Sequence, residues 1–491
     1  MAAQKGKKGE LRIRMYRVGF GDFFLFTVPT GDGPQHILID CGVTPGKAKK
    51  GKTPKGDIGT IKEAVAHMAK ETDHKLALII ATHRHQDHII GFSRCAEIFQ
   101  HFQGNVGAVW MSIWETEYDP NEKKEKKKKA LAFDFQEELT SLALGMQQHL
   151  ALGGSDSPDV DEIAAMLENA TGVDQATFAA TGGKAGGKVG KGGGTNAASL
   201  NFLKEGLGVE PQFLTKGDKP KMPAALTKAG LTAEILGPPP TDELDFMKLM
   251  DLKKGVGQFL GEAGDGSGEK FDPFGPQCCA GEKNYPKEAF REWEKRGLAK
   301  APHKAMEEAI HAAQPTLLFT AAKKLDDFLN NQSLVVLFTF NGKKLLFAGD
   351  AQGGNWEFWM FGGTLDPKAP ADKIVKESGK ILGHLDFYKV GHHGSTNATP
   401  ISAVEAMGGD FVAMCSTQEE SFGDPDNDSE VPRVPLLAAL GKKSKIARSD
   451  QIEVTDFEGK AVPVGDGAAK KLPTPDRGRF EKGSIFIDYF L

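Results

Sequence analysis

Residues 82–91 read THRHQDHIIG and directly follow the apolar run Leu76–Ala81. A short apolar run of this length predicts a strand that is buried on both faces. The polar segment after it holds three histidines and an aspartate within six positions, and both residue types bind zinc at about 2.0–2.2 Å. A single histidine is usually a hydrogen-bonded structural residue, but four ligand-type side chains at one strand end favour a metal site.

The spacing within the segment indicates how these side chains converge. His83 and His85 are two residues apart, so on an extended segment both point to the same side. Asp87 and His88 are adjacent, and a turn would direct them toward a second ion nearby. The segment therefore predicts one or two metal ions at the end of this strand.

Strand and helix patterns alternate along the rest of the chain, which predicts an α/β fold with layered sheets. Residues 10–42 read as three strands, 58–71 as a helix and 106–114 as a strand. Residues 331–352 give two apolar strands joined by an Asn-Gly turn and ending at Asp350. Residues 382–400 give a strand that ends at His392 and His393. Ligand-type side chains thus follow three different strands.

Two segments interrupt this pattern, at 119–205 and 241–328. The first contains the lysine run Lys123–Lys129, an amphipathic helix, a helix at 158–170 and a glycine-rich tract at 181–199. The second is polar, with helix-like pieces such as YPKEAFREWEKRG. Long excursions from strand ends often carry binding residues, so we expect these insertions to cover the metal cleft and to set specificity. A protein partner bound by the insertions is also compatible with this pattern.

Charge and cysteine usage restrict the class of protein. Lys and Arg number 61 against 66 Asp and Glu, a net charge of −5, which argues against a wholly basic nucleic-acid-binding protein. The five cysteines are scattered and resemble neither a disulfide framework nor a zinc ribbon. No apolar run reaches the roughly 20 residues that span a bilayer, and no secretory leader is visible. We expect a cytoplasmic protein without a membrane segment.

The ligand-type residues together suggest a reaction. If Asp350 bridges two divalent ions roughly 3.5–4 Å apart, the ions can activate water and stabilise both oxygens of an in-line displacement. Hydrolysis of a phosphodiester is the reaction that this arrangement favours.

The motifs resemble a known family. THRHQDHIIG is similar to the HxHxDH signature of the metallo-β-lactamase fold. YRVGFGDFFLF…HILIDCG, NQSLVVLFTFNGKKLLFAGDA and FYKVGHHGSTN follow in the order found in the soluble metallo-β-lactamase domain of ComEC-type DNA-uptake proteins and its stand-alone relatives. The resemblance covers 1–118 and 329–491 as the two halves of the domain, with return strands at 206–240. It implies an αββα sandwich of two mixed sheets, with largely helical insertions.

The resemblance also implies roles for individual residues. His83 and His85 would bind one metal, Asp87 and His88 the other, and Asp350 would bridge them. His392 would complete the second site, while the adjacent His393 would hold substrate or donate a proton. The remaining candidates are supporting residues at Asp40 and Asp22, and phosphate contacts or helix caps at Ser395 and Asn397.

One expected histidine is missing. Many relatives carry another metal-binding histidine between the first motif and the bridging aspartate, but VWMSIWETEY at 109–118 has none. The ligand set therefore leaves open one or two zinc ions, with manganese as the other metal. We expect a phosphodiesterase or nuclease that uses metal-bound hydroxide on nucleic acid or a nucleotide. The alternatives are a carboxyl-ester, lactone or phosphocholine esterase, and a catalytically reduced scaffold that binds a partner.

Overall fold

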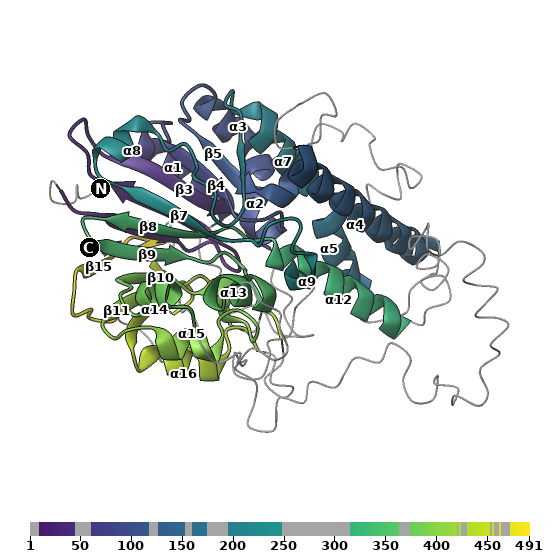
Figure 1. Ribbon diagram of the computed structural model, residues 1–491. Coiled ribbons are helices and arrows are strands. Elements are labelled where there is room, and N and C mark those ends of the chain that lie inside the picture. The colour runs from purple at the N-terminus through teal and green to yellow at the C-terminus, as the bar shows by residue number, and fades with distance from the viewer. Residues whose placement is uncertain are drawn as a thin grey trace.

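The computed structural model describes residues 9–44, 60–116, 126–152, 160–173, 195–247, 315–362, 374–419, 421–423, 430–451, 454–455, 461–462 and 472–491. Two mixed β-sheets lie face to face in this part of the chain (Figure 1). The prediction of an α/β fold with two mixed sheets is confirmed.

The first sheet has eight strands. Their order is β15 (Arg479–Lys482), β16 (Phe486–Phe490), β1 (Arg12–Tyr16), β2 (Phe23–Val28), β3 (Gln35–Cys41), β4 (Leu78–Ala81), β5 (Val109–Ser112) and β6 (Gln212–Leu214). Pairing is antiparallel from β15 to β3 and parallel from β3 to β6.

The second sheet has six strands. Their order is β12 (Ser444–Arg448), β11 (Phe411–Cys415), β10 (Phe387–Lys389), β9 (Lys343–Phe347), β8 (Val335–Phe340) and β7 (Thr232–Gly237). β7, β8 and β9 are antiparallel, and β9 to β12 are parallel. A separate short ribbon pairs β13 (Val454–Thr455) with β14 (Ala461–Val462). The two segments expected to return to the core, β6 and β7, thus join different sheets.

Strand alternation explains why the sheets pack in this way. In β2, Phe24 and Phe26 enter the core between the sheets, whereas Phe23 and Leu25 point to the opposite face. In β8, Phe338 belongs to the same central core, and Leu337 faces outward. Because successive side chains of a strand point to opposite faces, an unbroken apolar run is buried on both.

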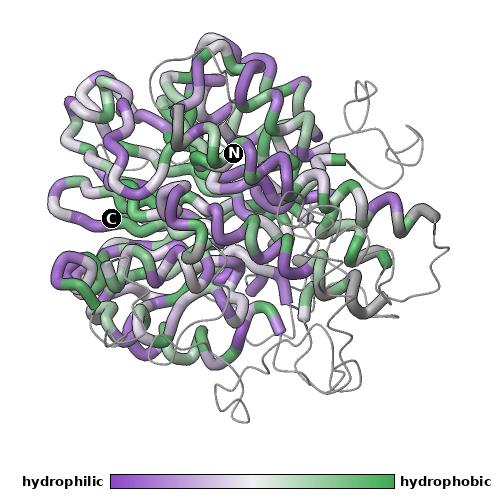
Figure 2. The backbone as a smooth tube through the Cα atoms, turned by 45° about the vertical axis from the view of Figure 1, so that its right-hand side comes forward, coloured by the Kyte–Doolittle hydropathy of each residue, from purple (hydrophilic) through white to green (hydrophobic). Residues whose placement is uncertain are grey.

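Helices cover both outer faces and give four layers, helix, sheet, sheet and helix. On the first sheet lie α1 (Ile61–Thr72), α2 (Gln86–Arg94), α3 (Ala96–Phe99) and the helical turn Gln100–Phe102. On the second lie α13 (Gly353–Met360), α14 (Lys376–Leu382), α15 (Ile401–Ala406) and α16 (Val434–Gly441). The outer helices in Figure 2 alternate between hydrophobic and hydrophilic residues, as expected for elements with one buried face.

A group of helices from the insertions lies at one end of the two sheets (Figure 1). It contains α4 (Lys126–Leu152), α5 (Val160–Thr171) and α12 (Pro315–Asn331), which share an apolar cluster around Met146, Leu167 and Leu329. Shorter elements are the helical turn Ile113–Glu115, α7 (Asn196–Asn201), the π-helical turn Phe202–Gly206, α8 (Ala224–Lys228) and α9 (Leu244–Met247).

The structure tests only part of what the insertions were expected to contain. α5 confirms the helix expected at 158–170, and α12 crosses the boundary expected at 328. The helix-like piece at 285–297, most of the glycine-rich tract and the first two lysines of the lysine run, Lys123 and Lys124, lie outside the described residues. Among the helices of the described ranges, none combines the length and apolarity required to cross a membrane.

Candidate metal centre

The first histidine segment leaves β4 in an extended conformation and then enters a helix. His85 is the N-cap of α2 with φ −65° and ψ 151°, so His83 and His85 lie on an extended stretch. Asp87 and His88 belong to the first turn of α2, which directs them away from the strand axis. A carboxylate in this first turn also suits the positive end of the helix dipole.

The other candidates come from the ends of β9 and β10 in the second sheet. Asp350 follows Gly349, whose φ of 54° bends the chain sharply after β9. His392 and His393 follow β10 with φ of 42° and 53°, a left-handed conformation that non-glycine residues rarely adopt. Two consecutive left-handed residues cost roughly 1–3 kcal/mol each and are concentrated at functional sites. Segments about 300 residues apart thus meet at one end of the sandwich, as the contact between Asp87 and His393 shows.

Four of these side chains form a tight group. The potential donor atoms of Asp87, His88, Asp350 and His393 all lie within 4.8 Å of one another. The Nε2 of His88 lies 3.0 Å from Asp350 Oδ2, and that of His393 lies 3.0 Å from Asp87 Oδ2 and 3.5 Å from Asp350 Oδ2. Two ligands of one tetrahedral zinc ion are about 3.3 Å apart, so these spacings fit a shared ion.

His83 and His85 complete the group on the side of β4. Their ring centroids are 4.6 Å apart, and the ring of His83 lies 4.1 Å from that of His88. Both side chains are buried, yet neither Nε2 has a hydrogen-bond partner. His88 Nε2 and Asp350 Oδ2 form no hydrogen bond either and are ion-paired with each other at 3.0 Å. A buried polar atom without a hydrogen bond costs about 1–3 kcal/mol. Four such atoms in one place are accounted for if they bind cations.

The far side of each imidazole is fixed by a hydrogen bond. Asp40 Oδ2 lies 2.8 Å from His88 Nδ1, and Ser416 O lies 2.8 Å from His393 Nδ1. Ser333 Oγ lies 3.1 Å from His83 Nδ1. Such contacts set the tautomer that leaves Nε2 free for a metal. The contact of Asp40 with His88 is the geometry expected of a residue that supports a metal ligand.

Asp22 also lies next to the group and is paired with Lys389, a residue that the sequence analysis missed. Its side chain forms an ion pair with Lys389, and its Oδ1 is 3.5 Å from His393 Nδ1. Lys389 Nζ also donates to Gly349 O at 3.0 Å and lies 3.4 Å from Asp350 Oδ1. Lys389 ends a buried strand, and no feature of the sequence distinguishes it from an exposed lysine.

His392 differs from His393 in exposure and in partners. The His392 side chain is 21% exposed and its Nε2 is 3.9 Å from Asp350 Oδ2, whereas His393 is fully buried. Ser395 Oγ and Asn397 Oδ1 lie 2.8 and 3.0 Å from His392 Nδ1. Sequence reasoning ranked His392 first as the ligand, but the geometry brings His393 to the donor group. Ser395 and Asn397 orient His392, and α15, with Pro400 as its N-cap, is capped by neither.

Charges within the group shift the protonation equilibria strongly. Burial alone would lower the pKa of His88, but the carboxylates of Asp350, Asp40 and Asp22 raise it well above its usual value. Burial would raise the pKa of Asp350, but His88, His393 and Lys389 lower it well below its usual value. His85 has few compensating charges, so burial lowers its pKa to about 4. The buried carboxylates thus attract positive charge, and a divalent cation bound here would take the place of the proton on His88, since imidazole binds metals in its neutral form.

The insertion helices reach this group, through residues that the sequence analysis did not identify. From α12, Asp326 Oδ1 lies 3.3 Å from His85 Nε2, and Asn330 Nδ2 lies 3.5 Å from His392 Nε2. From α5, Asn169 donates to Asp326 Oδ1 at 2.9 Å. Burial raises the pKa of Asp326 to about 7. The only sequence signal was the pair of adjacent aspartates, Asp326 and Asp327, within an amphipathic stretch.

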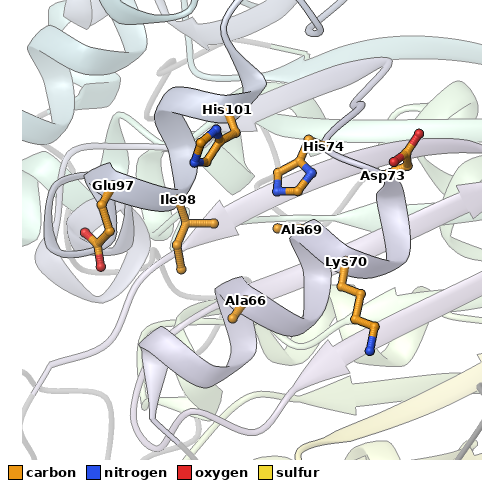
Figure 3. A pocket seen from close by; sticks show the side chains of 8 residues that line it. All are labelled: Ala66, Ala69, Lys70, Asp73, His74, Glu97, Ile98 and His101. Carbon is orange, nitrogen blue, oxygen red and sulfur yellow. The ribbon is translucent and has the colours of Figure 1, made fainter.

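A separate surface hollow of about 410 Å³ lies between α1 and α3 (Figure 3). It is lined by side chains such as Lys70, His74 and His101, and by none of the residues of the donor group. The donor group at the strand ends is thus separate from this hollow.

Comparison with protein-family models and with curated proteins gives no match.

Proposed function

We propose that the chain is a metal-dependent hydrolase of the metallo-β-lactamase fold, acting on phosphodiesters of nucleic acids or nucleotides. The observation that carries the proposal is the set of buried donor atoms without a hydrogen bond on His83, His85, His88 and Asp350. Four layers and motifs at the ends of β4, β9 and β10 agree with the αββα sandwich that the resemblance implies.

In this proposal zinc is the metal, and Asp87, His88, Asp350 and His393 form one site. His83 and His85 belong to the neighbouring site, and Asp350 lies between the two. Divalent ions bound here would activate water and offset the negative charge on the attacked phosphate. Asp40 and the carbonyl of Ser416 keep the imidazoles of His88 and His393 oriented, so that little rearrangement is needed on binding.

His392 is proposed to contact the substrate. Its Nδ1 donates to Asn397 Oδ1, which leaves a lone pair on Nε2 at the partly exposed side of the group. Burial lowers the pKa of His392 and so favours the neutral ring, whose Nε2 can accept a proton. Sequence reasoning gave this proton-transfer role to His393, and the fully buried His393 suits metal binding better.

The test measures metal content and turnover together. Purified protein should contain zinc or manganese and hydrolyse bis-(p-nitrophenyl) phosphate faster than p-nitrophenyl acetate, a carboxyl ester. Asp350→Asn should reduce kcat/KM at least about 100-fold and lower the metal content, because a direct ligand matters more than an outer partner. Protein purified without chelator that holds no metal would refute the proposal. Faster hydrolysis of the acetate would show that the substrates are carboxyl esters and not phosphodiesters.

A further inference from the structure

The sequence motifs provide only two protein ligands for the proposed metal site of His83 and His85, which we call the first site. His83 and His85 supply two nitrogen donors, and the segment 109–118, where relatives carry a histidine, has none. Zinc in a catalytic site normally has three protein ligands and an open position. A third donor must therefore come from elsewhere in the chain if this site holds an ion.

Helix α12 brings a carboxylate to this position. Asp326 Oδ1 lies 3.3 Å from His85 Nε2, which matches the separation of about 3.3 Å between two ligands of one tetrahedral ion. The two atoms do not form a hydrogen bond, and the buried Nε2 of His85, with its side chain 4% exposed, has no other partner.

Neighbouring residues hold Asp326 in place. Asn169 of α5 donates to Asp326 Oδ1 at 2.9 Å, and its own Oδ1 accepts from the backbone N–H of Gln86 at 3.1 Å. Asn196 of α7 donates to the carbonyl oxygen of Arg84 at 2.9 Å and to Asn169 at 3.2 Å. α5, α7 and α12 are thereby connected to the loop that contains His85. An arrangement of this kind is typical of the outer contacts of a metal ligand.

We propose that Asp326 is the third protein ligand of the first ion, in place of the missing histidine, so that an inserted helix completes the metal centre. This inference rests on the proposed function. It gives the insertion a direct role in the chemistry, in addition to covering the site. A carboxylate in place of an imidazole also makes this ion site more negative, which favours retention of a divalent cation over a neutral site.

The experiment compares the metal content of the wild type, Asp326→Asn and Asp327→Asn. Asp327 is the matched control, since it is adjacent on α12 and its Oδ1 accepts from Gln352 at 3.0 Å. Each protein is loaded with zinc, passed through a desalting column and analysed for zinc per chain. Cobalt titration, followed by the visible absorption of the bound ion, then gives the affinity of each site.

We expect two ions in the wild type and in Asp327→Asn, but one tightly held ion in Asp326→Asn. Loss of an outer partner already costs about 10–100-fold in affinity, so loss of this ligand should weaken the first site by more than about 100-fold. Circular dichroism should be unchanged, because the substitution preserves size. One ion in the wild type, or two in Asp326→Asn, would overturn the inference while leaving the hydrolase proposal standing. A wild type without any ion would refute the hydrolase proposal itself.

Discussion

At the scale of single residues, Asp40 shows how the backbone and the site are linked. Its φ of 55° is in the left-handed region, where Asp and Asn are among the few tolerated side chains. One oxygen accepts from the backbone N–H of Thr82 at 2.8 Å, and the other is 2.8 Å from His88 Nδ1. We predict that Asp40→Asn keeps the fold but lowers zinc affinity about 10–100-fold, because the charge that orients His88 is lost. Competition with a chromogenic chelator measures the effect.

Asp410 provides the control for this substitution. It has a φ of 67° and an exposed side chain in a turn before β11. Asp410→Asn should therefore leave zinc affinity unchanged. Equal affinities for Asp40→Asn and the wild type would show that His88 does not depend on the carboxylate.

At the scale of elements, α2 approaches the end of β3 so closely that one position allows only glycine. A Cβ at Gly42 would lie 2.1 Å from the backbone of Asp87 and His88. Gly42→Ala should push the first turn of α2 away and destabilise the protein by about 1–3 kcal/mol or more. It should also weaken zinc binding, since Asp87 and His88 are displaced. Denaturant unfolding and zinc titration check both effects.

Gly145 within α4 offers the opposite case. No atom lies within 4 Å of a Cβ built there, so Gly145→Ala should stabilise the protein by about 0.5–1 kcal/mol through helix propensity. If Gly42→Ala were as stable toward denaturant as Gly145→Ala, α2 and β3 could not be in such close contact at Gly42.

Elements with a strong periodic pattern could be predicted, and those defined by distant contacts could not. The Asn341-Gly342 turn has positive φ at both residues, as the hairpin prediction requires, and the nearly continuous apolar runs of β2 and β8 mark strands buried on both faces. The helix α12 was missed because the expected boundary at 328 falls inside it, although its apolar residues pack on the other inserted helices. Asp326 and Lys389 were missed because only tertiary contacts distinguish them from ordinary charged residues.

At the scale of the whole molecule, strands from the beginning and the end of the described chain lie side by side in the first sheet. β1 lies between β2 and β16, and Arg14 donates to both carboxylate oxygens of Asp488 at 2.6 Å. Beside these strands, the backbone N–H of Leu11 donates to Leu491 O at 3.2 Å, and that of Leu491 donates to Leu11 O at 2.9 Å. The sandwich is thus completed by strands from the two ends, while the middle of the chain builds the helical group.

The same region gives a prediction for the stability of the whole fold. His36 in β3 lies near Arg12, Arg14 and Glu71, and its pKa falls from 6.5 to about 4, first through burial and then through the charge of Arg12. A lowered histidine pKa means that the unfolded chain binds the proton more readily, so this stability is present above pH 6.5 and is lost as the pH falls toward 4. At about 1.4 kcal/mol per pKa unit, acidification through this range should cost about 2–3 kcal/mol at this residue. Denaturant unfolding with chelator present, at pH 7 and pH 4, should show a smaller loss for His36→Gln than for the wild type by that amount. An equal loss in both proteins would mean that His36 is protonated as readily in the folded state as in the unfolded chain.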